Sequence, residues 1–312
     1  MCASFLSKIQ WVKKALANSA NMDDRIHRAV VFQQRRETLT ARMLSSTESG
    51  VTSQAYGPEP LIVTLTTHGR RIHSVYLAIE SLFGQSCKPN RVVLYLSKDE
   101  FCDADLPVSL QRQRARGLEV RYVQDVGPHT KLVPALQEFP DALLLVTDDD
   151  IIYPFDLVER LLRLHRDHPC DVCATITRTL QCEGRKFKQF ESMPFNYLDE
   201  AVSSKKFLAE GFGGVLYPPH CLHPDVVRED LFRKLAPTAD DLWFKAMELR
   251  QGTSVCQMPG VRKQWNWTMA RVETVQYEGL WIENLIGGKN DEQLQALFDY
   301  YDLYRALEED LS

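Results

Sequence analysis

The chain has 312 residues, of which 44% are hydrophobic and 25% charged, and its formal net charge at pH 7 is −5. This composition is that of a globular protein, and the length allows one large α/β domain with attachments or two small domains. The mildly acidic balance argues against a protein whose main partner is nucleic acid, because such proteins usually carry a basic face.

The cysteines indicate a reducing compartment. Eight are scattered along the chain, and only Cys170 and Cys173 form a C-x-x-C pair. A structural zinc site would need a second such pair or a histidine pair, so we interpret these two as small residues around a buried strand and expect free thiols. No run of 18 or more apolar residues occurs, and lysines interrupt the first apolar stretch, so we expect a cytoplasmic protein without a secretory signal.

Residues 1–57 differ from the rest of the chain, since they carry a net charge of +4 and leave −9 to the remainder. An amphipathic helix is expected near the beginning, from the apolar residues Phe5, Ile9, Val12 and Leu16. Residues 1–20 could lie on an anionic membrane surface with Trp11 at the interface, which would make the protein peripheral at a membrane. Alternatively, this helix docks on the catalytic domain or on a partner chain. Residues 45–60 have the composition of a linker.

From residue 61 onward, short apolar runs alternate with helical patterns. Strands are expected over residues 61–67, 91–97, 119–123 and 142–147. Helices are expected over residues 72–83, 106–116, 131–139, 155–168, 241–249 and 290–311. This alternation predicts an α/β fold with a mostly parallel sheet flanked by helices, a helical N-terminal extension and a C-terminal helix. Ligands of such sheets bind beyond the carboxyl ends of the strands.

Three consecutive acids stand at one of these strand ends. The apolar run that ends at Thr147 is followed directly by Asp148, Asp149 and Asp150, and then by Ile-Ile-Tyr-Pro. Crowded carboxylates raise one another's pKa, and a bound divalent cation removes that cost. The alternative is a solvated turn with helix-capping acids. Their position at a strand end favours a Mg²⁺ or Mn²⁺ site held by Asp148 and Asp150.

The run over residues 145–154 resembles the D-x-D signature of GT-A fold glycosyltransferases, particularly the family-2-like bacterial enzymes of lipopolysaccharide and capsule assembly. Other segments fit that pattern in the same order, namely residues 64–71 with 81–86, 127–136, 211–217 and 239–244. The resemblance implies a Rossmann-like GT-A catalytic domain over residues 58–260. It would lie between a basic helical extension with a linker over residues 1–57 and an aromatic segment with a helical tail over residues 261–312.

The resemblance further implies a metal-dependent inverting glycosyltransferase that moves a sugar from a UDP-sugar to a hydroxyl of a cell-surface glycan or glycolipid. The metal would neutralise charge on the leaving phosphate. Donor-binding roles are expected for Thr66, Thr67, Ser97, Asp148, Asp149, Gly213 and Gly214. Lys131, with Arg70 or Arg71, would supply positive charge near the diphosphate. Of the adjacent acids Asp240 and Asp241, the first could be a helix N-cap, and the family pattern favours Asp241 as the base that takes the acceptor proton. A sugar-phosphate nucleotidyltransferase and a catalytically silent nucleotide-binding scaffold remain as alternatives.

Two further features of the sequence each allow a functional and a structural interpretation. The tryptophans of residues 264–268, together with Trp243 and Trp281, could stack on a sugar or could belong to the core. Residues 288–292 could form a capping turn or a loop that closes over a diphosphate.

Overall fold

The computed structural model describes residues 29–261, 270–272, 284 and 287–308. The expected amphipathic helix near residue 5 and the tryptophans Trp265, Trp267 and Trp281 therefore lie outside the described residues. Within the described ranges, no helix is long and apolar enough to cross a membrane.

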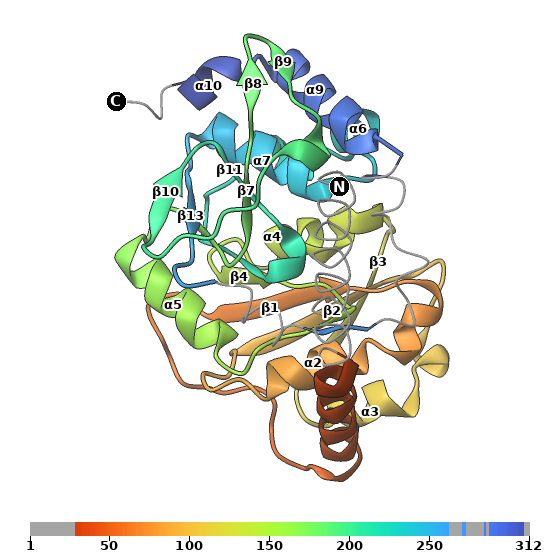
Figure 1. Cartoon of the computed structure of the whole chain (residues 1–312). Helices are drawn as coiled ribbons and strands as arrows, with labels where there is room; N and C mark the ends of the chain where they lie inside the picture. Colours follow the sequence, from red (N-terminus) through yellow and green to blue (C-terminus); the bar gives the residue numbers. More distant parts are fainter. Residues whose placement is uncertain (1–28, 262–269, 273–283, 285–286, 309–312) are drawn as a thin grey trace, which may run out of the picture.

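The centre of the molecule is one eight-stranded sheet (Figure 1). Its strands are, in spatial order, β10 (Val202–Ser204), β13 (Val255–Gln257), β6 (Val172–Ala174), β12 (Val215–Tyr217), β4 (Leu143–Val146), β1 (Leu61–Thr66), β2 (Arg91–Ser97) and β3 (Leu118–Val123). Strands β10 and β12 run antiparallel to their neighbours, and the other pairings are parallel. The expected α/β class with a mostly parallel sheet flanked by helices is confirmed.

Helices cover both faces of this sheet. They are α2 (Tyr76–Phe83), α3 (Val108–Arg114), α4 (Val133–Glu138), α5 (Leu157–Asp167), α6 (Glu229–Leu235), α7 (Asp240–Gln251), α9 (Lys289–Tyr301) and α10 (Tyr304–Glu308). Alternate strand residues enter two separate cores: Val63 and Leu65 pack with α2, α3 and α5, whereas Ile62 packs with α4, α6, α7, α9 and α10. This alternation is the period-two pattern of a sheet buried on both sides.

The strand order contains a reversal that positions the site. From β1 the chain moves outward through α2 to β2 and through α3 to β3, and then returns through α4, on the opposite face, to place β4 on the other side of β1. Right-handed crossovers in opposite directions put their helices on opposite faces. The carboxyl ends of β1 and β4 therefore flank a topological switch point, where open α/β sheets bind ligands.

The remaining strands form small two-stranded pieces. Strands β7 (Thr177–Thr179) and β11 (Phe207–Ala209) pair antiparallel next to the main sheet. Two shorter pairs join β8 (Cys182–Glu183) to β9 (Lys186–Phe187) and β5 (Ile151–Ile152) to β14 (Ala270–Arg271). None of these short strands was expected from the sequence.

A helix over residues 29–45 packs against the body of the domain. Its Phe32 and Leu39 contact a small apolar cluster that includes Leu77 and Ile152. Arg42 of this helix lies 3.2 Å from the fully buried carboxylate of Glu80 on α2. The expected linker begins at the end of this helix and is held to the domain, because the Asn90 amide donates to the carbonyls of Thr52 and Gln54.

One expected helix is shorter in the structure and another is divided. The helix expected over residues 131–139 is α4, which begins at Val133 because a 3-10 turn (Gly127–Lys131) precedes it, and Pro134 is in its first turn. The segment over residues 290–311 is divided into α9 and α10 by Asp302, whose φ of 51° is left-handed and ends a helix.

Candidate active site

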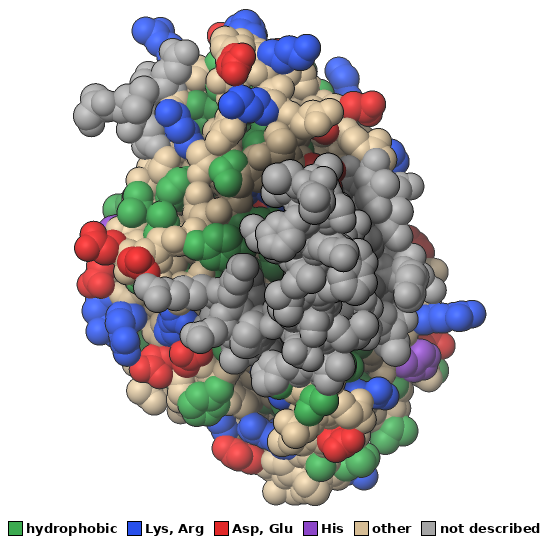
Figure 2. All heavy atoms as spheres, viewed as in Figure 1, with side chains coloured by type: hydrophobic (Ala, Val, Ile, Leu, Met, Phe, Trp, Pro, Cys, Tyr) green, Lys and Arg blue, Asp and Glu red, His purple; other side chains and the backbone are tan. Residues whose placement is uncertain are grey.

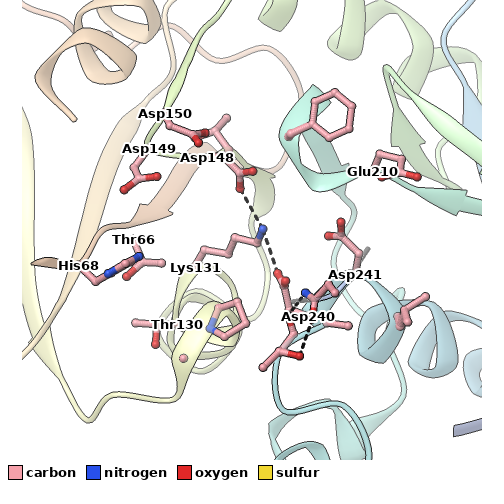
Figure 3. A pocket seen from close by; sticks show the side chains of 18 of the residues that line it. Thr66, His68, Thr130, Lys131, Asp148, Asp149, Asp150, Glu210, Asp240 and Asp241 are labelled. Carbon is pink, nitrogen blue, oxygen red and sulfur yellow. Dashed lines mark hydrogen bonds and ion pairs between the residues drawn. The ribbon is translucent and has the colours of Figure 1, made fainter. Parts of the chain in front are cut away.

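A cavity of about 740 Å³ opens at the switch point. Its walls include the ends of β1, β2 and β4, the 3-10 turn before α4, and the first residues of α7. Figure 3 shows the sheet-derived acids on one side of this space and Asp240 and Asp241 on the other. The cavity therefore brings together the two acidic motifs, which are about ninety residues apart in the sequence.

The three consecutive acids after β4 divide into two groups. Asp149 is buried and turns toward β1, where its carboxylate accepts a 2.5 Å hydrogen bond from Thr67 Oγ1. Asp148 and Asp150 are more exposed than Asp149 and line the cavity. The backbone N–H of Asp148 donates to the Tyr153 hydroxyl at 2.7 Å, and that hydroxyl donates to the Phe212 carbonyl at 3.3 Å, which fixes the turn after β4.

Two protein cations neutralise these acids. Arg71 Nη2 lies 2.9 Å from Asp149 Oδ1 and 2.5 Å from Asp150 Oδ2. Lys131 Nζ lies 2.9 Å from Asp148 Oδ1 and 2.9 Å from Asp240 Oδ2, so it bridges the two sides of the cavity (Figure 3). Its backbone is held as well, because Thr64 of β1 donates a 2.5 Å hydrogen bond to the Lys131 carbonyl.

Asp240 and Asp241 begin α7, and neither is its N-cap. The N-cap is Ala239, so the interpretation of Asp240 as a capping residue is wrong, and both acids are in the first turn. There they face the positive end of the helix dipole, which favours carboxylates. Asp241 Oδ2 accepts a 3.0 Å hydrogen bond from the backbone N–H of Gly211. A Cβ at position 211 would stand 2.6 Å from Asp241 Oδ1 and 3.0 Å from Lys131 Nζ, so glycine permits this approach.

Burial controls the protonation of the site. Burial alone would lower the pKa of Lys131, but the charges of Asp148, Asp240 and Asp241 raise it well above its ordinary value. Burial raises the pKa of Asp149 to about 7 in spite of Arg71. Burial, together with the charge of Asp240, raises the pKa of Asp241 well above its usual range. The result is a permanent ammonium beside a carboxyl group with an unusually strong affinity for a proton.

The wall opposite β1 is built by Arg178 of β7 and Glu210. Arg178 Nε donates to Glu210 Oε1 at 2.7 Å, and Arg178 Nη1 donates to the carbonyls of Phe190 and Met193. The guanidinium lies 4.6 Å and 4.1 Å from the ring centroids of Phe190 and Phe195. This arrangement holds Glu210 in the cavity wall, and Phe190 and Phe195 line the same cavity.

The structure brings most of the expected site residues together. Thr66, Thr67, Ser97, Lys131, Asp148, Asp149, Asp150, Asp240 and Asp241 all line the cavity. Arg70 is exposed and does not line it, and its neighbour Arg71 lines it instead. Gly213 and Gly214 are not in the lining either, because Glu210 and Phe212 form that part of the wall. Gly213 packs instead against Thr175, the residue after β6, whose Oγ1 would lie 2.4 Å from a Cβ at position 213.

Residues of the wall to which the sequence analysis gave no role include His68, Thr130, Arg178 and Glu210. His68 and Thr130 stand within segments that the resemblance had singled out, so their neighbours gave a signal. Arg178 and Glu210 carried none, since the pairing of β7 with β11 brings them together from separate parts of the chain.

Trp243 belongs to the core and does not line the cavity. It is fully buried in α7, and its indole Nε1 donates to the Val226 carbonyl at 3.0 Å. Gly288 is the N-cap residue of α9 and has a left-handed backbone, while Asn290 lines the cavity.

The donor set of the sheet-side acids fits a hard divalent cation. Asp148 and Asp150 offer carboxylate oxygens at the cavity wall, and Mg²⁺ or Mn²⁺ is commonly held by one or two carboxylates together with substrate phosphates. Among the described residues, these acids do not form a compact group of three ligands. A cation here would therefore need oxygens from its substrate, as nucleotide-dependent sites usually do.

Comparisons with known proteins find only solved structures of low sequence identity. No protein-family model matches it, and no curated protein sequence matches it. One similar solved structure is S. aureus TarS 1–349 in complex with UDP, with 13% identity over 63% of this chain and a TM-score of 0.42. Another is the mannosyltransferase PcManGT from Pyrobaculum calidifontis in complex with GDP-Man and Mn²⁺, with 14% identity over 90% of this chain and a TM-score of 0.41. The chain spans 56% of the first structure and 81% of the second.

Proposed function

We propose that this protein is a metal-dependent GT-A-type glycosyltransferase that moves a sugar from a nucleotide donor, a UDP-sugar, to a hydroxyl of a glycan or glycolipid. The observation that best supports this proposal is that Asp148 and Asp150 line the same cavity as Asp241, at the switch point of a mostly parallel sheet. The sheet-side acids supply oxygen ligands for a cation, and Asp241 supplies a base across the cavity.

The chemistry follows from the charge that the reaction creates. A nucleotide-sugar donor leaves as a nucleoside diphosphate, and negative charge develops on its phosphate oxygens. A divalent cation bound by Asp148 and Asp150 would supply Lewis-acid neutralisation of that charge. Lys131, whose raised pKa keeps it protonated, places a second positive charge at the same wall.

Proton transfer is assigned to Asp241. The attacking hydroxyl must lose its proton, and a carboxylate with a raised pKa is a better acceptor than an ordinary one. The hydrogen bond from Gly211 N–H fixes one of its oxygens, which orients the other. A base on the side of the cavity opposite the metal ligands suits direct displacement, and so we propose inversion at the anomeric carbon.

A panel of nucleotide sugars tests the proposal. With the parent protein and Mn²⁺ or Mg²⁺, at least one donor should release nucleoside diphosphate, and chelation with EDTA should stop the release. Asp150→Ala should lower this rate by about 100-fold or more, because one stabilising contact to developing charge is commonly worth that much.

Asp141→Asn is the matched control, since it also removes one surface carboxylate but lies outside the cavity lining. It should retain the parent rate. If Asp150→Ala turned over the donor as fast as the parent, the proposed metal role would be wrong. Release of pyrophosphate from a nucleoside triphosphate and a sugar phosphate, with no diphosphate release from any donor, would indicate a nucleotidyltransferase.

A further inference from the structure

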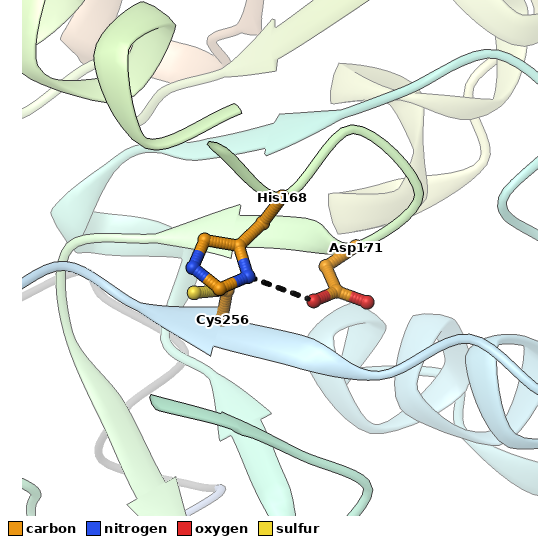
Figure 4. Close-up of side chains that lie close together, drawn as sticks. All are labelled: His168, Asp171 and Cys256. Carbon is orange, nitrogen blue, oxygen red and sulfur yellow. Dashed lines mark ion pairs between the residues drawn. The ribbon is translucent and has the colours of Figure 1, made fainter. Parts of the chain in front are cut away.

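A second cluster of metal-ligand side chains lies away from the cavity. His168, Asp171 and Cys256 place one potential ligand atom each within 4.8 Å of one another (Figure 4). None of the three lines the cavity described above. Among the described residues this is the one group of three or more His, Cys, Asp or Glu side chains that meets this criterion.

Three separate elements build this His168–Asp171–Cys256 cluster. His168 is the C-cap residue of α5, and Asp171 directly precedes β6. The Asp171 N–H donates to the His168 carbonyl at 3.2 Å, which closes the turn between them. Cys256 lies on β13, which pairs in parallel with β6. The pairing of β13 with β6 therefore brings the Cys256 thiol close to the His168 imidazole and the Asp171 carboxylate, although Cys256 is more than 80 residues later in the sequence.

The donor chemistry points to one metal. We propose that the His168–Asp171–Cys256 cluster binds a zinc ion through imidazole nitrogen, carboxylate oxygen and thiolate sulfur, with a water molecule as fourth ligand. Zinc accepts this mixed set in tetrahedral geometry, in which ligand atoms lie about 3.3–3.8 Å apart for bonds of about 2.0–2.3 Å. His168 Nδ1 and Asp171 Oδ2 are already 3.6 Å apart.

The surroundings fit such a site. Ser203 of β10 donates a 2.5 Å hydrogen bond to Asp171 Oδ2, and a partner of this kind orients a ligating carboxylate. Cys256 is fully buried, whereas the side chains of His168 and Asp171 are 30% and 20% exposed. The ion would enter from the exposed side. One thiolate and one carboxylate would balance its double charge.

The site would act on stability rather than on the proposed transfer reaction. It would tie the C-terminal end of α5 to β6 and β13 at the edge of the main sheet, where β10 is the last strand. Zinc bound only by the native state raises the melting temperature by mass action. This inference does not rest on the proposed glycosyltransferase function.

Cobalt titration of the full chain tests the inference, because Co²⁺ replaces Zn²⁺ and gives a thiolate-to-cobalt charge-transfer absorption that carboxylate sites lack. The parent should bind one equivalent of Co²⁺ with this band, and added Zn²⁺ should abolish the band. Cys256→Ser should lose it, and His168→Gln should weaken binding at least about 10-fold.

Two controls separate this site from other metal or thiol sites. Asp150→Ala, which removes a ligand of the proposed catalytic cation, should keep the band. Cys170→Ser removes a free, exposed thiol close in sequence and should also keep it. His168→Gln keeps the inference testable if Cys256→Ser does not fold, since His168 is partly exposed. A parent without the band, a band retained in Cys256→Ser, or unchanged affinity in His168→Gln would each overturn the proposal.

Discussion

Asp241 shows how a single side chain of the candidate active site depends on its neighbours. Its position needs three things at once: the first turn of α7, a glycine at 211 that lets the two backbones approach, and Lys131 nearby to offset the crowded acids. None of these is visible in the Asp-Asp dipeptide alone. The role of base that we propose for Asp241 therefore depends on where the fold places this side chain.

We predict that Asp241→Asn lowers kcat by about 10²–10⁴-fold, the usual contribution of a positioned base. Asparagine is nearly isosteric and can still accept the hydrogen bond from Gly211, so donor affinity should change little. Steady-state kinetics with the best donor of the panel, together with calorimetric titration of the nucleotide, measure both quantities.

Glu229→Gln on α6 is the control for this prediction, because it also replaces an acid by its amide and lies outside the cavity lining. Its kcat should match the parent. A kcat of Asp241→Asn within two-fold of the parent value would remove Asp241 from the proposed mechanism and leave Glu210 as the remaining acid on that wall.

At the scale of elements, α7 carries the two acids of the candidate site at its first turn and a buried ion pair further along. Lys245 Nζ lies 3.0 Å from Glu248 Oε2, and both side chains are almost completely buried. Burial raises the pKa of Glu248 in spite of its partner. A buried pair of this kind is costly to break on one side and nearly neutral to replace as a whole.

We predict that Lys245→Met destabilises the protein by about 3–5 kcal/mol, because it leaves an unpaired buried carboxylate. The double variant Lys245→Met/Glu248→Leu should recover most of that loss. Urea unfolding of the parent, the single variant and the double variant measures the difference. Equal destabilisation of the single and double variants would show that the ion pair itself, and not the orphaned charge, stabilises α7.

The strands show which elements the sequence could predict. The expected strand over residues 91–97 coincides with β2, and the expected strand over residues 119–123 differs from β3 by one residue. The first strand is a nearly continuous apolar run, and the second alternates apolar with charged residues, so each pattern indicates a strand. Short strands such as β7 and β11 have three residues each, too few for a period to be read. Their pairing comes from tertiary contacts, and with it the wall of Arg178 and Glu210.

The choice between Arg70 and Arg71 shows the same limit within the site. The sequence predicts a positively charged side chain in the segment after β1, and in the structure Arg71 of that segment lines the cavity. Which of two successive arginines faces the cavity depends on the 3-10 turn over Gly69–His73, and no side-chain pattern predicts that turn. Motifs at strand ends were thus readable from the sequence, whereas the orientation of individual side chains in the following loops was not.

At the scale of the whole molecule, the surface and the interior differ in their polar side chains. Figure 2 shows positive and negative side chains intermixed over the described part of one face. The interior instead contains isolated polar groups, among them His129, which is completely buried and stacks on Phe232 with ring centroids 4.2 Å apart. Neither ring nitrogen of His129 has a hydrogen-bond partner among the described residues. Burial lowers the pKa of this imidazole to about 3.

We predict that His129 makes the native state sensitive to mild acid. The unfolded chain takes up a proton on this imidazole near pH 6.5, whereas the folded chain does so only near pH 3. Its contribution to stability is therefore complete above pH 6.5 and is lost as the pH falls toward 3. Between pH 8 and pH 5 the loss amounts to about 2 kcal/mol, from about 1.4 kcal/mol per pH unit.

His129→Leu should flatten this part of the pH profile by the same amount, as measured by urea unfolding at both pH values. Replacement of the exposed His73 by Gln is the control and should leave the parent profile unchanged. A His129→Leu protein with the same loss between pH 8 and pH 5 as the parent would place the acid sensitivity elsewhere.

Lys131 also links the two sides of the cavity, in addition to supplying charge. Its ammonium is 2.9 Å from Asp148 on the strand side and 2.9 Å from Asp240 on the helix side, so one side chain sets the width of the gap between them. Any movement of α7 away from the sheet must break one of these two contacts. The nitrogen that we propose to meet the donor phosphates therefore also sets the distance between Asp148 and Asp240, across which the sugar would be transferred.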